Sequence, residues 1–183
     1  MSKRKLYIDF DGVIKDTWVI MRKMIIDANL VPDYSKETMD FLASINYEED
    51  VLEKSAQIND SINNIKKIIA AGVFDVYILS HISQQKEAVA KIKYLRKQLD
   101  NITIIPVPVV IPKTMVVDPK GAILIDDTDM NLKAWEEAGG IAIKFQPEGK
   151  CEKNKTINYL ADILNYDKLI SKNNELELKK EFN

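Results

Sequence analysis

The sequence predicts an α/β fold in which helices cover both faces of a doubly wound, parallel, five-stranded sheet. Short apolar runs alternate with segments of helical periodicity along the 183 residues, and this alternation is typical of parallel strands joined by right-handed helical crossovers. A stretch without strands separates the first two runs and predicts a small all-helical cap inserted after the first strand. Hydrophobic residues make up 46% of the chain, which is enough to bury one sizeable core.

The apolar runs are short and rich in Ile, Val, Leu, Phe and Tyr, as expected for strands that are buried on both faces. They span residues 5–9, 74–80, 102–106, 121–126 and 141–145. Between the second and third runs, an amphipathic helix is expected from apolar residues that recur at helical spacing. Its predicted apolar stripe consists of Val89, Ile92, Leu95 and Leu99.

Residues 16–71 interrupt this alternation because they contain several helical segments and no convincing strand. Ser35 is a typical helix start and Gly72 a typical helix end. Ligands of open α/β sheets bind at the carboxyl ends of the strands, so an insertion after the first strand would lie over the binding crevice. We therefore expect an α/β core formed by residues 1–15 and 72–150, covered by a cap of residues 16–71.

The last third of the chain contains one more helix of the expected core and then becomes polar. Residues 128–138 have helical character and end at a glycine pair, and Trp135 is expected to be buried in the core. Residues 151–183 are expected to form an amphipathic helix followed by a charged tail, to which we assign no chemistry. The single cysteine, Cys151, excludes an internal disulfide.

Two carboxylates, Asp9 and Asp11, stand at the end of the first apolar run and are followed by Gly12, which permits a sharp turn. Neighbouring carboxylates repel each other unless a cation or a shared proton lies between them. Mg²⁺ prefers oxygen ligands, so the pair predicts metal-assisted chemistry. Calcium loops also contain a DxDG element, but they need further oxygen ligands at positions that Val13 and Val19 occupy here.

Polar side chains also follow the other predicted strands. Ser80 ends the second run, Lys113 follows the third, and Asp126 and Asp127 end the fourth. The carboxyl ends of parallel strands meet at one edge of a sheet, so these side chains are expected to converge on one pocket. Simpler interpretations are a strand-end cap for Ser80, a helix N-terminus for the two aspartates, and Lys120 in place of Lys113.

Taken in this order, DFDGV at 9–13, Ser80, Lys113 and IDD at 125–127 resemble the motifs of the haloacid-dehalogenase-like (HAD) phosphohydrolases. The resemblance extends from the first predicted strand to the fifth and implies a Rossmann-like core. More narrowly, DFDGVIKD, Lys113 with Thr114, and LIDD with a downstream Trp and Gly-Gly are similar to the 5'(3')-deoxyribonucleotidase branch. An enzyme that hydrolyses phosphoric monoesters is therefore implied.

This resemblance implies catalysis with Mg²⁺ and an aspartyl-phosphate intermediate. Asp9 would attack the phosphorus atom, and Asp11 would donate a proton to the leaving group and later accept one from water. The metal would bind to Asp9, to the backbone carbonyl of Asp11 and to Asp126. Asp127 is expected behind these ligands, where it would orient a metal-bound water or Lys113, with Asn131 as a minor contributor.

The phosphate group is expected to be bound by the Ser80 hydroxyl, the Lys113 ammonium and the backbone amide of His81. His81 is the only histidine of the chain, and a role as general base is its alternative. Asp16 and Trp18, at the start of the cap, are candidate substrate-binding residues. Trp18 would stack on a nucleobase or, alternatively, pack in the core.

The expected substrate is a nucleoside or deoxynucleoside monophosphate. Alternatives are a phosphatase of sugar phosphates or other small metabolites, a phosphotransferase that uses the same intermediate, and a metal-binding regulatory module without activity. A net charge of −2 provides no basic field for a nucleic-acid polymer or an anionic membrane. A cytoplasmic protein is expected, and the sequence does not specify its oligomeric state.

Overall fold

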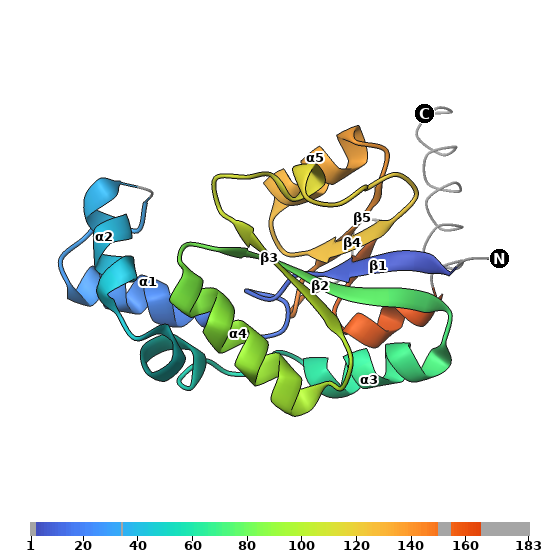
Figure 1. Ribbon diagram of the computed structural model, residues 1–183, viewed down its shortest axis with the longest axis horizontal. Coiled ribbons are helices and arrows are strands. Elements are labelled where there is room, and N and C mark those ends of the chain that lie inside the picture. Colours follow the sequence, from blue (N-terminus) through green and yellow to red (C-terminus); the bar gives the residue numbers. More distant parts are fainter. Residues whose placement is uncertain (1–2, 34, 150–154, 166–183) are drawn as a thin grey trace.

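The computed structural model describes residues 3–33, 35–149 and 155–165. Its centre is one parallel sheet of six strands in the order β3-β2-β1-β4-β5-β6 (Figure 1). The strands are β1 (Arg4–Ile8), β2 (Phe74–Ile82), β3 (Thr103–Pro108), β4 (Ile123–Asp126), β5 (Ile141–Phe145) and β6 (Thr156–Ile157). The predicted doubly wound α/β fold is confirmed, and β6 adds an edge strand to the five that were predicted.

Alternate residues of the central strand face two separate apolar layers, as the pleat of a strand requires. Leu6 and Ile8 of β1 face a cluster that includes residues of α3 (Ser61–Ala71), α4 (Gln85–Gln98) and η3 (Leu160–Asn165). Tyr7 faces the opposite cluster, which is built around Trp135 of α5 (Asp129–Glu137). Figure 1 shows α3 and α4 below the sheet and α5 above it. Trp135 is fully buried, as predicted.

The buried face of α4 differs from the predicted apolar stripe. Leu95 is fully buried, but Val89 is 51% exposed. The charged side chains of Glu87 and Lys91 lie on the buried face instead. The stripe was wrong at Val89 because part of this helix faces a charged site rather than the apolar layer of the sheet.

Three helices precede α3 and lie beyond the carboxyl ends of the strands (Figure 1). They are α1 (Thr17–Asp27), α2 (Lys36–Ser44) and the π-helix η1 (Tyr47–Leu52). Ser35 caps α2 by accepting a hydrogen bond from the Thr38 amide, as its position in the sequence predicted. Gly72 ends α3 with a φ of +69°.

The predicted division into core, cap and tail stays a prediction. Helix α3 packs against β2 and η3, so we propose that the cap ends before Ser61. Cys151 and the predicted tail beyond residue 165 lie outside the described residues. Within the described part of the chain, no helix combines the length and apolar character needed to cross a membrane.

Candidate active site

A tight turn after β1 positions the first two aspartates. The backbone amide of Asp9 donates to the carbonyl of Ile125 in β4, which continues the pairing of the two strands by one residue. The carbonyl of Phe10 then accepts hydrogen bonds from the amides of Ile14 and Lys15, which folds the chain back on itself. Gly12, at the tip, has a φ of +71°, a conformation that favours glycine.

Lys113 links the first and fourth strand ends. It lies in the 3-10 helix η2 (Lys113–Met115), and its Nζ is 2.8 Å from Asp9 Oδ1 and 2.7 Å from Asp126 Oδ2. All three side chains are buried. Lys120, the alternative from the sequence, lies on the surface instead. The structure thus brings together Asp9, Lys113 and Asp126, although Asp126 follows Asp9 by 117 positions in the sequence.

Asp126 is held by donors from the start of α5. Its Oδ1 accepts a 2.8 Å hydrogen bond from the amide of Thr128, and Asn131 Nδ2 lies 3.0 and 3.2 Å from its two carboxylate oxygens. Asp127 lies beside Asp126 and accepts a hydrogen bond from the Thr128 hydroxyl. Lys144 donates to the backbone carbonyl of Asp127.

Three carboxylates form a cluster that fits a divalent cation. One oxygen from each of Asp9, Asp126 and Asp127 lies within 4.8 Å of the others. Asp9 Oδ1 is buried and accepts no well-directed hydrogen bond from the described residues, although the Lys113 ammonium is close to it. Such oxygen donors suit Mg²⁺. The expected place of Asp127 behind the metal ligands stays a prediction, and its carboxylate lies close enough to Asp9 and Asp126 to be a ligand as well.

The pKa values of the cluster reflect burial first and the crowding of negative charge second. Burial, opposed by Lys113 and reinforced by Asp126 and Asp11, raises the pKa of Asp9 to about 8. Burial and the neighbouring charge of Asp126 raise the pKa of Asp127 to about 6. A bound cation would favour the ionised form of both carboxyls.

Asp11 points away from this cluster and is surrounded by donors. Its Oδ1 accepts hydrogen bonds of 2.5 Å from Thr17 and 3.2 Å from Tyr47. Its Oδ2 lies 2.5 Å from the ammonium of Lys91, which also lies 2.6 Å from Glu87 Oε1. Thr17 and Tyr47 belong to the expected cap, so residues from three separate segments hold one carboxylate.

These donors set the charge state of Asp11. Burial alone would raise its pKa, but the ammonium of Lys91 and the hydrogen bonds from Lys91, Thr17 and Tyr47 lower it below its ordinary value. Burial would likewise lower the pKa of Lys91, but the negative charges of Asp11 and Glu87 raise it. Asp11 and Lys91 therefore form an ion pair in which Lys91 is buried and Asp11 is partly exposed to the cavity. Lys91 was not predicted from the sequence, although the i,i+4 spacing of Glu87 and Lys91 on the helix after Ser80 was a usable signal.

Ser80 and His81 occupy different environments. The Ser80 hydroxyl is buried, lies 3.4 Å from Asp11 Oδ2 and accepts a 3.1 Å hydrogen bond from Lys91. His81 Nε2 lies 3.1 Å from the carbonyl oxygen of Ile111, which can only accept, so this nitrogen carries a proton. Burial, followed by the charge of Lys113, lowers the pKa of His81.

Strand β2 also continues through His81 to Ile82, two residues beyond its predicted end at Ser80.

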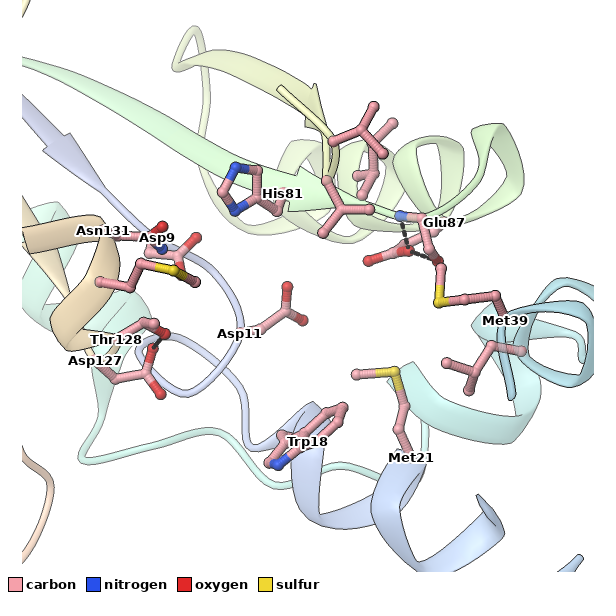
Figure 2. A pocket seen from close by; sticks show the side chains of 16 residues that line it. Asp9, Asp11, Trp18, Met21, Met39, His81, Glu87, Asp127, Thr128 and Asn131 are labelled. Atoms are coloured by element: carbon pink, nitrogen blue, oxygen red, sulfur yellow. Dashed lines mark hydrogen bonds between the residues drawn. The ribbon is translucent and has the colours of Figure 1, made fainter. Parts of the chain in front are cut away.

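A cavity of about 640 Å³ opens over the aspartates. Asp9, Asp127, Thr128 and Asn131 lie on one side of Asp11, while Met21, Met39 and Glu87 lie on the other (Figure 2). Trp18 and His81 also line this cavity, and Trp18 is 47% exposed rather than buried in the core. Ser80, Lys113 and Asp16 are not among the lining residues.

Comparisons with known proteins identify the fold. Scans against models of protein families and against curated proteins find no match. Solved structures do match. A HAD-superfamily hydrolase of subfamily IA from Geobacter sulfurreducens superposes with a TM-score of 0.59 at 12% identity, covering 90% of this chain and 100% of its own. The chain has the fold of the HAD-superfamily hydrolases.

Two further structures with this HAD fold are similar over comparable lengths. A haloacid dehalogenase-like hydrolase from Streptococcus pneumoniae has a TM-score of 0.57 at 13% identity, with 90% of this chain and 98% of that chain covered. A HAD-hydrolase from Bacillus subtilis, which was crystallised bound to magnesium, has a TM-score of 0.56 at 15% identity, with 91% and 99% covered.

Proposed function

We propose that this protein is a Mg²⁺-dependent phosphomonoesterase that acts through an aspartyl-phosphate on Asp9. The observation that carries the proposal is the cluster of Asp9, Asp126 and Asp127 beside Lys113 at the base of a cavity. These three carboxylates would hold Mg²⁺, with the backbone carbonyl of Asp11 as a further ligand. When bound, Mg²⁺ would neutralise the charge of the phosphoryl group and of the carboxylate that attacks it.

Each of the two chemical steps uses both residues of the β1 turn. In the first step an oxygen of Asp9 forms a bond to phosphorus while the bond from phosphorus to the leaving oxygen breaks. Asp11 gives that oxygen a proton, for which its carboxyl group must first leave the ion pair with Lys91 and become protonated. In the second step water attacks the phosphorus of the aspartyl-phosphate and gives a proton to Asp11. Inorganic phosphate leaves, and the Asp9 carboxylate is restored.

The remaining residues of the site would bind the phosphoryl oxygens and hold the two acids. Lys113 supplies a positive charge within 3 Å of Asp9 and Asp126. The Ser80 hydroxyl and the backbone amide of His81 are the other proposed phosphate donors. Asn131 would keep the Asp126 carboxylate in place through its amide.

The proposed substrate is a small phosphorylated metabolite, with a nucleoside or deoxynucleoside monophosphate as the first candidate. The half-exposed indole of Trp18 in the cavity wall supports this choice, because an aromatic ring can stack on a nucleobase. Asp16 lies two residues before Trp18 but is not among the residues that line the cavity, which argues against a direct contact with substrate. Sugar phosphates are the second candidate, and transfer to an acceptor other than water would use the same intermediate.

Phosphate release from a simple phosphomonoester, with and without Mg²⁺, tests the reaction. The Asp9→Asn variant is expected to lose at least about 10⁴-fold in kcat, because an amide does not replace the attacking carboxylate. Asp100→Asn, at an exposed position outside the site, is the matched control and should retain full activity. The proposal is wrong if the wild-type protein shows no Mg²⁺-dependent release, or if Asp9→Asn retains it while folded.

A further inference from the structure

The part of the cavity beyond Asp11 is walled by apolar side chains. They come from the helices after β1 and from the loop after β3, and comprise Trp18, Met21, Met39, Leu42 and Val110. Two of them are strongly exposed: Trp18 by 47% and Val110 by 85%. Exposed large apolar side chains that gather around one cavity are typical of a ligand-binding surface.

The charged residues of the cavity wall have one sign. Asp9, Asp11, Glu87 and Asp127 line it, and the lining contains no lysine or arginine among the described residues. Burial lowers the pKa of His81, which favours its neutral form, so His81 does not supply a permanent positive charge. Outside the region of the transferred phosphate, the wall therefore offers no cation to a second anionic group of a substrate.

On this side of Asp11 two polar side chains of the wall, Ser83 and Glu87, bind each other. The two oxygens of Glu87 are bound by Lys91 on one side and by the amide and hydroxyl of Ser83 on the other. Thr128 and Asn131 lie on the other side of Asp11, beside Asp9 (Figure 2). A leaving group rich in hydroxyls would lose its hydrogen bonds to water there without regaining them, which disfavours its binding.

We infer that the cavity selects phosphomonoesters whose leaving group carries an uncharged aromatic ring and no second anionic group. This inference rests on the proposed function and specifies its substrate class. The ring would lie against Trp18 and the methionines, while the phosphate would reach Asp9. Sugar phosphates, bisphosphates and carboxylated phosphate esters are rejected, the first for their hydroxyls and the others for their charge.

Three primary alkyl phosphates with similar intrinsic reactivity test the inference: phenethyl phosphate, ribose 5-phosphate and a phenethyl phosphate that carries a carboxylate on its ring. With Mg²⁺, kcat/KM for phenethyl phosphate is expected to exceed the values for the other two by at least about tenfold. Equal or faster turnover of ribose 5-phosphate overturns the inference and leaves the proposed function standing. Absence of Mg²⁺-dependent release from all three overturns both.

Variants of the apolar wall add a test that does not depend on comparing different esters. Val110→Lys is expected to raise kcat/KM for the carboxylated ester at least about fivefold relative to Val110→Gln, because only lysine supplies a cation. Both replacements are at a position that is 85% exposed, so folding is preserved. Equal activity of the two variants towards the carboxylated ester contradicts the inferred reason for its rejection.

The contribution of the aromatic wall is tested at Trp18. Trp18→Ala is expected to raise KM for phenethyl phosphate at least about fivefold and to leave KM for ribose 5-phosphate unchanged. Tyr159→Ala is the matched control, because Tyr159 is 51% exposed and does not line the cavity. Equal changes in KM for the two esters overturn the assignment of the ring to this wall.

Discussion

Lys113 makes it possible for Asp9 and Asp126 to lie close together in a buried site. Its ammonium contacts both carboxylates, and burial would otherwise disfavour the charge on each of them. Because two negative charges and Asp127 face one positive charge, the cluster keeps an excess of negative charge. Burial first, and the negative charges of Asp126 and Asp11 second, raise the pKa of Asp9 to about 8 against the opposing effect of Lys113. A divalent cation would offset the excess of negative charge.

The raised pKa of Asp9 predicts how stability depends on pH when no divalent cation is present. The folded protein keeps a proton on Asp9 up to a pH of about 8, whereas the unfolded chain releases it near the ordinary pKa of 3.8. The free energy of unfolding is therefore expected to fall as pH rises between these two values. Thermal unfolding midpoints measured in a chelator across this interval should fall less steeply for Asp9→Asn than for the wild type.

Asp100→Asn is the control for this pH dependence, because Asp100 is exposed and lies outside the cluster. Its unfolding midpoints should follow those of the wild type. Parallel curves for all three proteins would contradict the raised pKa of Asp9. Added Mg²⁺ should flatten the wild-type curve, because binding to the ionised carboxylates releases the proton.

Lys91 is the buried positive partner of two carboxylates, the partly exposed Asp11 and the buried Glu87. The variant Lys91→Met leaves both without a positive partner and is expected to lower the free energy of unfolding by about 3–5 kcal/mol. Lys93→Met is the matched control on the same helix. Lys93 pairs with Glu48 at the surface, so its loss should cost about 1 kcal/mol or less. Urea unfolding measures both, and similar losses would argue against a buried ion pair at Lys91.

The sequence predicted those site residues that directly follow strands. Asp9 and Asp126 could be placed because apolar runs mark where their strands end, and the carboxyl ends of parallel strands converge. Lys91 and Tyr47 were missed because their positions depend on how a helix and the expected cap pack around Asp11. No local sequence pattern predicts that Lys91 is buried, because its burial depends on the carboxylates that pack around it.

At the scale of elements, the turn after β1 determines how Asp127 joins the cluster. Gly12 has a positive φ, and a Cβ atom at this position would lie 2.2 Å from Asp127 Oδ2. The turn therefore needs glycine both for its backbone conformation and for the space beside the carboxylate. This contact joins the loop after β1 to the end of β4.

Gly12→Ala is expected to displace the Asp127 carboxylate and to lower Mg²⁺-dependent kcat/KM by about 10²-fold, because small misplacements of catalytic groups are costly. Gly121→Ala is the matched control. Gly121 has a φ of +69°, close to the +71° of Gly12, but a Cβ there meets nothing within 4 Å. Both variants share the backbone cost of about 1–2 kcal/mol, so equal activities would contradict the proposed role of the contact.

The sheet was largely predictable because its strands are buried on both faces and appear as continuous apolar runs. All four residues of β4 are buried, for example. Strand β6 has only two residues, too few to produce a pattern in the sequence. The burial of α4 was predicted in part, because Glu87 and Lys91 occupy a face that amphipathic patterns assign to solvent.

At the scale of the whole molecule, the cavity lies between the carboxyl edge of the sheet and the helices that follow β1 (Figure 2). The sheet contributes the acids, and the helices contribute Trp18, Met21 and Met39. This division separates the proposed chemistry from the proposed selection of the leaving group. Changes in the helices should therefore alter KM for particular esters, whereas changes at the strand ends should alter kcat for all of them.

Chemical identification of the phosphorylated residue tests the central claim, that Asp9 forms a covalent bond to the phosphoryl group. Asp11→Asn should accumulate this species, because it lacks the carboxylate that accepts a proton from the attacking water. The variant is mixed with Mg²⁺ and 4-nitrophenyl phosphate, whose leaving group departs without a proton from Asp11, then quenched in acid and digested, and its peptides are analysed by mass spectrometry. We expect a phosphoryl group on the peptide that contains Asp9, bound to that residue, and we expect it to disappear when Asp9→Asn is added to the variant. Phosphate release by the wild type without any phosphorylated Asp9 in the quenched variant, or phosphorylation at another residue, would contradict this claim.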